Sequence, residues 1–193
     1  MNKLHVCSLA LLLLVAMMVS PANAFDNNRQ GFMLSVGAGP SMTNYEMYYD
    51  GDESKFGGGT DFKIGGGINN QVQLYWLART AFFSQDYPRY TLYGGFVGTE
   101  SVTYMNGFYG GGISYYFQPQ APSWYMVGAL GLVTLSAPFD DDFDDYSESG
   151  TGFSFGAGYE FSRHWMIEAS WSVGDIENTT FQTWKVVVGY LAY

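Results

Sequence analysis

The chain has 193 residues, a net charge of −10 and only 13% charged residues, together with 19% aromatic residues and 25 glycines. Soluble domains usually carry about 25% charged residues, and disordered chains combine few aromatic residues with a high charge density. The composition therefore argues against both classes. The acidic balance also argues against a nucleic-acid partner, because nucleic-acid-binding surfaces are basic.

The N-terminus has the three parts of a secretory signal peptide. A short positive start is followed by Leu9–Val19, an unbroken apolar run of 11 residues, and then by a small-x-small cleavage site at Ala22-Asn23-Ala24. Eleven residues are too few for a membrane-spanning helix, which takes about 20. We therefore predict a cleavable signal peptide at residues 1–24 and one exported domain at residues 25–193. The only cysteine, Cys7, belongs to the predicted signal peptide, so the exported domain has no disulfide bond.

Eight later segments alternate between apolar and small or polar residues, which is the pattern of β-strands. The alternation is clearest in Thr151–Phe161 and Trp165–Gly174, where aromatic residues share one face and Gly, Ser and Glu share the other. Only three residues separate these two segments, which predicts a tight hairpin. In chain order, the predicted strands are Phe32–Met42, Gly59–Ile68, Gln71–Phe83, Ser101–Phe117, Trp124–Ser136, Thr151–Phe161, Trp165–Gly174 and Thr183–Tyr193.

Three of these strands are less regular. The run Gly110-Gly111-Gly112 is a candidate position for a β-bulge that shifts the alternation. The strand Trp124–Ser136 is apolar on both faces. The last strand has two possible facings, and we favour the one that places Trp184 outside and Lys185 inside. A lipid-facing lysine at depth would cost about 2–4 kcal/mol.

The connections between the predicted strands alternate between short and long. The short ones have about 2–6 residues, whereas the long ones are polar. Short turns at one end and long loops at the other are typical of an outer-membrane β-barrel, and a face of Gly, Ser and isolated charges suits the narrow interior of eight strands. We therefore predict an all-β fold, an eight-stranded antiparallel up-and-down transmembrane β-barrel. The long loops are expected at Thr43–Gly58, Ser84–Glu100, Ala137–Gly150 and Asp175–Thr180.

The segment Thr151–Gly174 resembles the penultimate hairpin of the small outer-membrane β-barrels, the family of opacity-type porins and OmpA/OmpX-like barrels. The shared features are Gly-x-Gly-Tyr-x-Phe at 156–161, the three-residue turn, and Ile-Glu-Ala-Ser-Trp at 167–171. The terminal Tyr193 is similar to the family's C-terminal assembly signal, although family members usually end on Phe. The resemblance implies a monomer in the outer membrane of a Gram-negative bacterium, in contact with lipid and lipopolysaccharide. It also implies assembly by periplasmic chaperones and the barrel assembly machinery.

The predicted lumen-facing charges are the main candidate functional residues. They are Asp61, Lys63, Arg79, Glu160 and Glu168, with Lys185 as a sixth candidate. Charges in a narrow lumen need partners, because an unpaired buried charge is costly. One interpretation is a structural salt-bridge network, in which Glu160 and Glu168 share Arg79 or Lys63. The alternative is a gated path for small ions.

A second candidate is an acidic run in the third long loop, formed by Asp140, Asp141, Asp142, Asp144 and Asp145. It lacks the spacing of an EF-hand loop. The run is therefore either a solvated loop tip or a weak site for a divalent cation such as calcium, for which clustered carboxylates are suitable ligands.

The sequence favours a protein that is not an enzyme. We identify no catalytic residues, no cofactor and no dedicated metal site, and we expect His164 to be an exposed turn residue. The favoured function is a structural envelope role combined with adhesin-like surface interaction, including host or surface ligands, through the long loops. The alternative is a narrow porin-like channel or a transporter for small or hydrophobic solutes.

Overall fold

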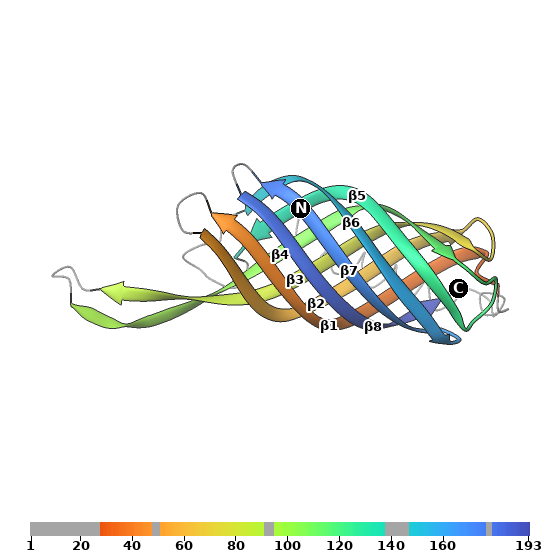
Figure 1. Cartoon of the computed structure of the whole chain (residues 1–193), viewed down its shortest axis with the longest axis horizontal. Helices are drawn as coiled ribbons and strands as arrows, with labels where there is room; N and C mark the ends of the chain where they lie inside the picture. Colours follow the sequence, from red (N-terminus) through yellow and green to blue (C-terminus); the bar gives the residue numbers. More distant parts are fainter. Residues whose placement is uncertain (1–27, 48–50, 91–94, 138–146, 177–178) are drawn as a thin grey trace, which may run out of the picture.

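The computed structural model describes residues 28–47, 51–90, 95–137, 147–176 and 179–193. Its eight strands form one closed antiparallel barrel in which each strand pairs with its sequence neighbour and β8 pairs with β1 (Figure 1). In these ranges no helix is long and apolar enough to cross a membrane. The strands are β1 Gly31–Met47, β2 Gly51–Gly67, β3 Val72–Tyr90, β4 Phe96–Tyr116, β5 Ser123–Ser136, β6 Ser147–Ser162, β7 Trp165–Ile176 and β8 Thr179–Ala192.

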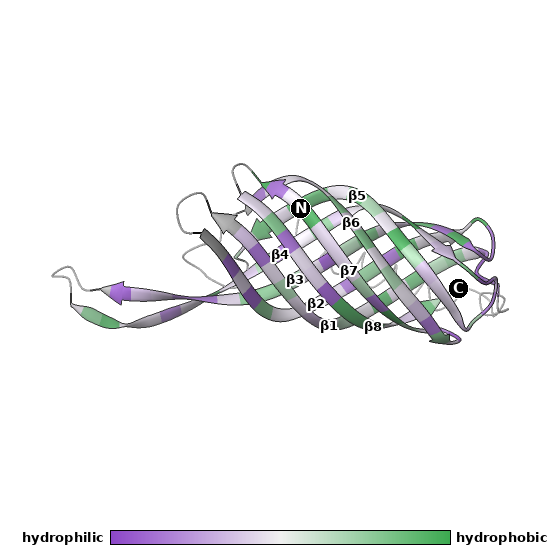
Figure 2. Ribbon diagram, in the orientation of Figure 1, coloured by the Kyte–Doolittle hydropathy of each residue, from purple (hydrophilic) through white to green (hydrophobic). Residues whose placement is uncertain are grey.

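Side chains alternate between the outside and the inside of the barrel along every strand, as the sequence predicts. In β8, Trp184 and Val188 are about half exposed on the outer surface, whereas Lys185 and Val187 are buried inside. The favoured facing of the last strand is therefore confirmed. Hydrophobic residues recur along the strands (Figure 2), and large apolar side chains such as Leu130 and Phe155 are exposed on the outer surface, which is the surface that lipid contacts in a barrel of this kind.

The long loops are shorter in the structure than the sequence suggests. Much of the expected loop Ser84–Glu100 belongs to β3 and β4, which continue as a hairpin that projects far beyond the rest of the barrel (Figure 1). Polar cross-strand pairs hold this hairpin, and the hydroxyl groups of Tyr87 and Tyr104 lie 2.9 Å apart. Apolar alternation marks only the part of a strand that faces lipid, so it does not reveal the parts of β3 and β4 that continue into water.

The predicted bulge at Gly110-Gly111-Gly112 is wrong. The β3–β4 register runs without interruption through these glycines, and it shifts only between Arg89 and Tyr90 in the projecting hairpin. A Cβ atom added to Gly112 would lie 2.5 Å from the ring of Tyr75. The inward-facing glycine therefore makes room for an aromatic side chain in the lumen.

Three short turns and both ends of the described chain lie at the opposite end, which is the periplasmic end in outer-membrane β-barrels. In the turn between β6 and β7, His164 has a φ of 69°, and its Nδ1 lies 2.7 Å from the carbonyl oxygen of Leu191. Its ring also contacts Tyr190 and Tyr193. His164 is thus a partly buried structural residue, and the expectation of an exposed turn residue is wrong.

Two predictions lie outside the described residues. They concern the signal peptide at residues 1–24 and the acidic run of residues 140–145, which stay predictions.

Candidate functional site

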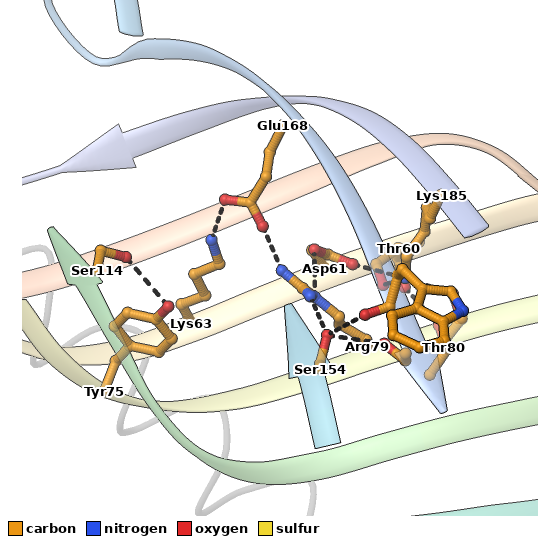
Figure 3. Close-up of polar contacts among 12 residues, drawn as sticks. Thr60, Asp61, Lys63, Tyr75, Arg79, Thr80, Ser114, Ser154, Glu168 and Lys185 are labelled. Atoms are coloured by element: carbon orange, nitrogen blue, oxygen red, sulfur yellow. Dashed lines mark hydrogen bonds and ion pairs between the residues drawn. The ribbon is translucent and has the colours of Figure 1, made fainter. Parts of the chain in front are cut away.

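Among the residues that the structure describes, seven charged side chains are buried inside the barrel, each at most 3% exposed. Four are cations and three are carboxylates, and they divide into a central cluster and a periplasmic pair. The central cluster is drawn in Figure 3, where β2, β3, β7 and β8 supply its charges. Its members are Asp61, Lys63, Arg79, Glu168 and Lys185, and the periplasmic pair is Arg29 and Glu160.

Arg79 joins the two carboxylates of the central cluster. Its Nε donates to Asp61 Oδ2 at 3.0 Å, and its Nη2 donates to Glu168 Oε1. Lys63 Nζ lies 2.5 Å from the other oxygen of Glu168, and Lys185 Nζ lies 2.6 Å from Asp61 Oδ1. Three cations therefore share two carboxylates, which leaves one positive charge in excess.

Neutral groups take up the remaining donors of the central cluster. Lys185 Nζ donates to the carbonyl oxygens of Thr60 and Thr80, each at 3.0 Å. Arg79 Nη1 lies 2.5 Å from Ser154 Oγ, and Lys63 Nζ lies 5.4 Å from the centre of the Tyr75 ring (Figure 3). Peptide carbonyl oxygens and the faces of aromatic rings both carry partial negative charge. They therefore stabilise the excess positive charge of the cluster, which has no third carboxylate.

The periplasmic pair lies below the central cluster, at the mouth of the barrel. The Nε and Nη2 atoms of Arg29 donate to Glu160 Oε2 at 3.0 and 2.8 Å, and the Tyr193 hydroxyl donates to Glu160 Oε1 at 2.7 Å. Burial, together with this hydrogen bond, raises the pKa of Tyr193, which follows the last residue of β8. Both oxygens of the Glu160 carboxylate are thereby satisfied.

The structure brings the predicted lumen residues into the interior, but it pairs them differently from the hypothesis. Glu168 binds both Lys63 and Arg79, whereas Glu160 binds neither of them and pairs with Arg29. Arg29 could not be predicted from the alternation, because it precedes the first strand. It is nevertheless the only cation between the predicted cleavage site and that strand, which is the signal that could have identified it.

Uncharged side chains fill the interior between and above the charges. Tyr116 and Tyr125 pack with ring centres 4.8 Å apart, and the hydroxyl of Tyr125 donates to Glu168 Oε2 at 2.9 Å. Toward the extracellular end, Tyr45 stacks on Phe83. An eight-stranded barrel is just wide enough for side chains to fill it, and these contacts show that filling directly.

The part of the chain that the structure describes holds no group of three or more His, Cys, Asp or Glu side chains arranged to hold a metal ion. The arrangement of charges is chemically suited to ion pairing. Each carboxylate of the central cluster accepts hydrogen bonds from charged donors, and Glu168 also accepts one from the hydroxyl group of Tyr125.

Similarity to known proteins establishes the family and the fold of this chain. The family model described as an outer membrane protein beta-barrel domain matches residues 8–191. Among solved structures, Ail, the attachment invasion locus protein of Yersinia pestis, is similar with a TM-score of 0.56 and 12% sequence identity over 83% of this chain and 98% of that chain. OprG of Pseudomonas aeruginosa is similar with a TM-score of 0.52 and 11% identity over 86% of this chain and 98% of that chain.

A structure of Ail in complex with the heparin analogue sucrose octasulfate is also similar, with a TM-score of 0.55 and 14% identity over 83% of this chain and 98% of that chain. No curated protein matches the sequence. Identities this low establish a common fold and no common ligand. The chain belongs to the outer-membrane β-barrel family, and it is a protein of the bacterial outer membrane.

Proposed function

We propose that this protein is a non-conducting, non-enzymatic barrel that supports the envelope and presents its projecting β3–β4 hairpin to partners outside the cell. The observation that carries the proposal is the contrast between a lumen filled by buried side chains and a long hairpin that projects beyond the barrel (Figure 1). The name of Ail, an attachment and invasion protein with the same fold, supports a surface-binding role.

The hairpin extends beyond the pairing of its neighbours. Pairing of β2 with β3 ends at Gly57–Phe83, and pairing of β4 with β5 begins at Met105–Ser136. In the described part of the chain, the hairpin beyond these points is therefore a two-stranded ribbon, formed by Ser84–Tyr90 and Phe96–Tyr104. A ribbon of this kind offers two faces to a partner.

The ribbon is stiffened by its own side chains and still leaves large groups exposed. Ser84 Oγ lies 3.1 Å from Thr103 Oγ1, and Arg89 Nε lies 3.2 Å from Glu100 Oε2. Val97 remains 65% exposed. An ordered element with exposed apolar and charged groups loses little conformational entropy on binding, which favours a role in recognition.

Replacing residues 85–103 by a two-residue turn tests this role. We expect the shortened barrel to fold, as shown by a heat-shift in electrophoresis, and bacteria that display it to lose at least tenfold in binding to host cells or matrix. The matched control is Val97→Thr, which keeps the hairpin and changes one exposed side chain. Equal binding by the full-length and shortened proteins would contradict the proposal.

A second candidate function is the passage of small hydrophobic solutes through the wall of the barrel. A groove of about 760 Å³ lies on β3–β6, and its lining includes outward-facing Leu130 and Phe153 as well as inward-facing Tyr75 and Ser154. Gly128, also in the lining, would meet nothing within 4 Å if it carried a Cβ atom. The groove thus lies open on the lipid-facing surface, over a part of the barrel wall where Gly111 and Gly128 carry no side chain.

Planar bilayer recordings and solute uptake distinguish the two candidates. A folded protein without single-channel conductance and without uptake supports the non-conducting barrel. Uptake of a small aromatic hydrocarbon that is lost in Gly128→Leu would instead establish the transport function.

A further inference from the structure

We propose that residues Asn28–Gln30, here called the N-terminal strap, are a built-in lid that closes the periplasmic mouth of the barrel and is held shut by Arg29. The strap precedes β1 and has no regular secondary structure. Arg29 is nevertheless 0% exposed, which is unusual for an arginine outside a strand. This lid is independent of the surface-binding role proposed for the hairpin.

Two glycines allow the strap to enter the mouth. Gly31, the first residue of β1, has a φ of +94°, a conformation that favours glycine, and it lets the chain turn from the barrel wall. Gly67, the last residue of β2, lies against the strap, and a Cβ atom there would lie 1.6 Å from the carbonyl oxygen of Arg29. Gly31 therefore acts as the hinge, and Gly67 as the surface on which the strap rests.

The guanidinium group of Arg29 connects parts of the mouth that are far apart in the sequence. It binds Glu160 of β6, and its Nη1 donates to the carbonyl oxygens of Asn70 and Gln118, at 3.1 and 2.8 Å. These two residues follow β2 and β4, in two of the three periplasmic turns. Its Cζ also lies 4.0 Å from the centre of the Tyr116 ring. Only a planar group with five donors can make this set of contacts.

The lumen behind the strap holds an unsatisfied polar group. Gln73 pairs with Gly67 in the β2–β3 register and is 1% exposed, and its Nε2 atom has no hydrogen-bond partner in the described part of the protein. A buried amide without a partner is unfavourable. Opening the strap brings solvent to this amide, which offsets part of the cost of breaking the Arg29 contacts. The unpaired amide of Gln73 therefore lowers the cost of opening the strap.

The central charge cluster lies deeper in the barrel and closes it independently. Opening the strap exposes the space up to this cluster and no further, so we expect greater solvent access and no conductance. Solvent access to position 73 therefore tests the strap, whereas binding of a partner by the hairpin tests the proposed function. One proposal can fail while the other holds.

Thiol labelling tests the strap directly, because the predicted exported domain contains no natural cysteine. A Gln73→Cys reporter lies behind the strap, and an Asn106→Cys reporter lies inside the barrel near Thr183, beyond the central cluster. The probe is a small cationic methanethiosulfonate, added to folded protein in lipid vesicles. We expect Arg29→Ala to increase the labelling rate at the first reporter at least tenfold and to leave the second unchanged.

Two further variants separate a lid from a general loss of structure. Arg163→Ala removes an exposed arginine from the adjacent periplasmic turn and should change neither rate. Glu160→Gln keeps the size of the side chain, removes its charge, and should raise the rate at the first reporter at least threefold, which provides the test even if Arg29→Ala does not fold. Unchanged labelling in a folded Arg29 or Glu160 variant, or an equal increase at both reporters, would overturn the proposal.

Discussion

The interior of the barrel and the projecting β3–β4 hairpin use the same kind of ion pair in opposite surroundings. Glu168 binds Lys63 and Arg79 with side chains that are 0–3% exposed, whereas Arg89 and Glu100 in the hairpin are 65% and 40% exposed. Water and salt screen the second pair and cannot reach the first. The location of a pair, more than its identity, therefore determines how much the fold depends on it.

The two regions also differ in what surrounds each charge. Each hydrogen-bond partner of Glu168 is a donor on a strand of the barrel. Removing the charge of Glu168 therefore leaves these donors buried without a charged acceptor. Around Glu100, solvent replaces a lost partner at once. The effects of substitutions on stability should therefore decrease from the centre of the barrel to the tip of the hairpin.

The largest effect is expected for Glu168→Gln. It leaves Lys63 and Arg79 buried with a neutral partner, and breaking a buried pair in this way costs about 3–5 kcal/mol. Urea unfolding in lipid vesicles, followed by tryptophan fluorescence, measures the loss. The matched control, Glu100→Gln, should cost less than about 1 kcal/mol. Similar losses in the two variants would mean that the interior is hydrated.

The next effect is steric, and it concerns Gly158→Ala in β6. The added Cβ would lie 2.3 Å from the Tyr125 ring, which holds Glu168 in place, and overpacking of this kind costs about 1–3 kcal/mol. The control is Gly128→Ala, where the Cβ meets nothing within 4 Å. The same unfolding assay distinguishes them, and a loss in the control equal to that of Gly158→Ala would contradict the tight packing of the lumen.

A smaller effect is expected for Lys185→Met. This variant removes the excess cation, while Asp61 keeps its bond to Arg79. The expected loss is therefore about 1 kcal/mol, which is the net value of an ordinary hydrogen bond. Denaturant midpoints at constant pH measure it. A loss as large as that of Glu168→Gln would show that Asp61 needs both cations.

The smallest effect is expected for Tyr87→Phe at the hairpin. The variant removes a hydroxyl pair that is exposed to solvent, so water replaces the lost bond, and stability should fall by less than about 0.5 kcal/mol. The unfolding midpoint should stay unchanged, while hydrogen exchange at neighbouring hairpin amides increases by a few-fold. A clear shift of the midpoint would show that the hairpin contributes to the stability of the barrel.

Much of the barrel could be predicted from alternation alone, because lipid on one side and a narrow lumen on the other impose a period of two on each strand. Trp184 and Lys185 show this well, since one lies outside and the other inside as expected. The continuation of β3 to Tyr90 could not be predicted in this way. Beyond the membrane both faces of a strand meet water, and the period disappears.

The sequence by itself determined the family, the number of strands and the inward facing of Asp61, Lys63, Arg79, Glu160 and Glu168. Only the tertiary structure decided which charges meet, because partners in a closed barrel are set by register and by the height of each residue along the axis. Glu168 therefore binds two cations from β2 and β3, and Glu160 binds Arg29 from outside the strands. These contacts join residues 89 to 131 positions apart, and no local pattern encodes them.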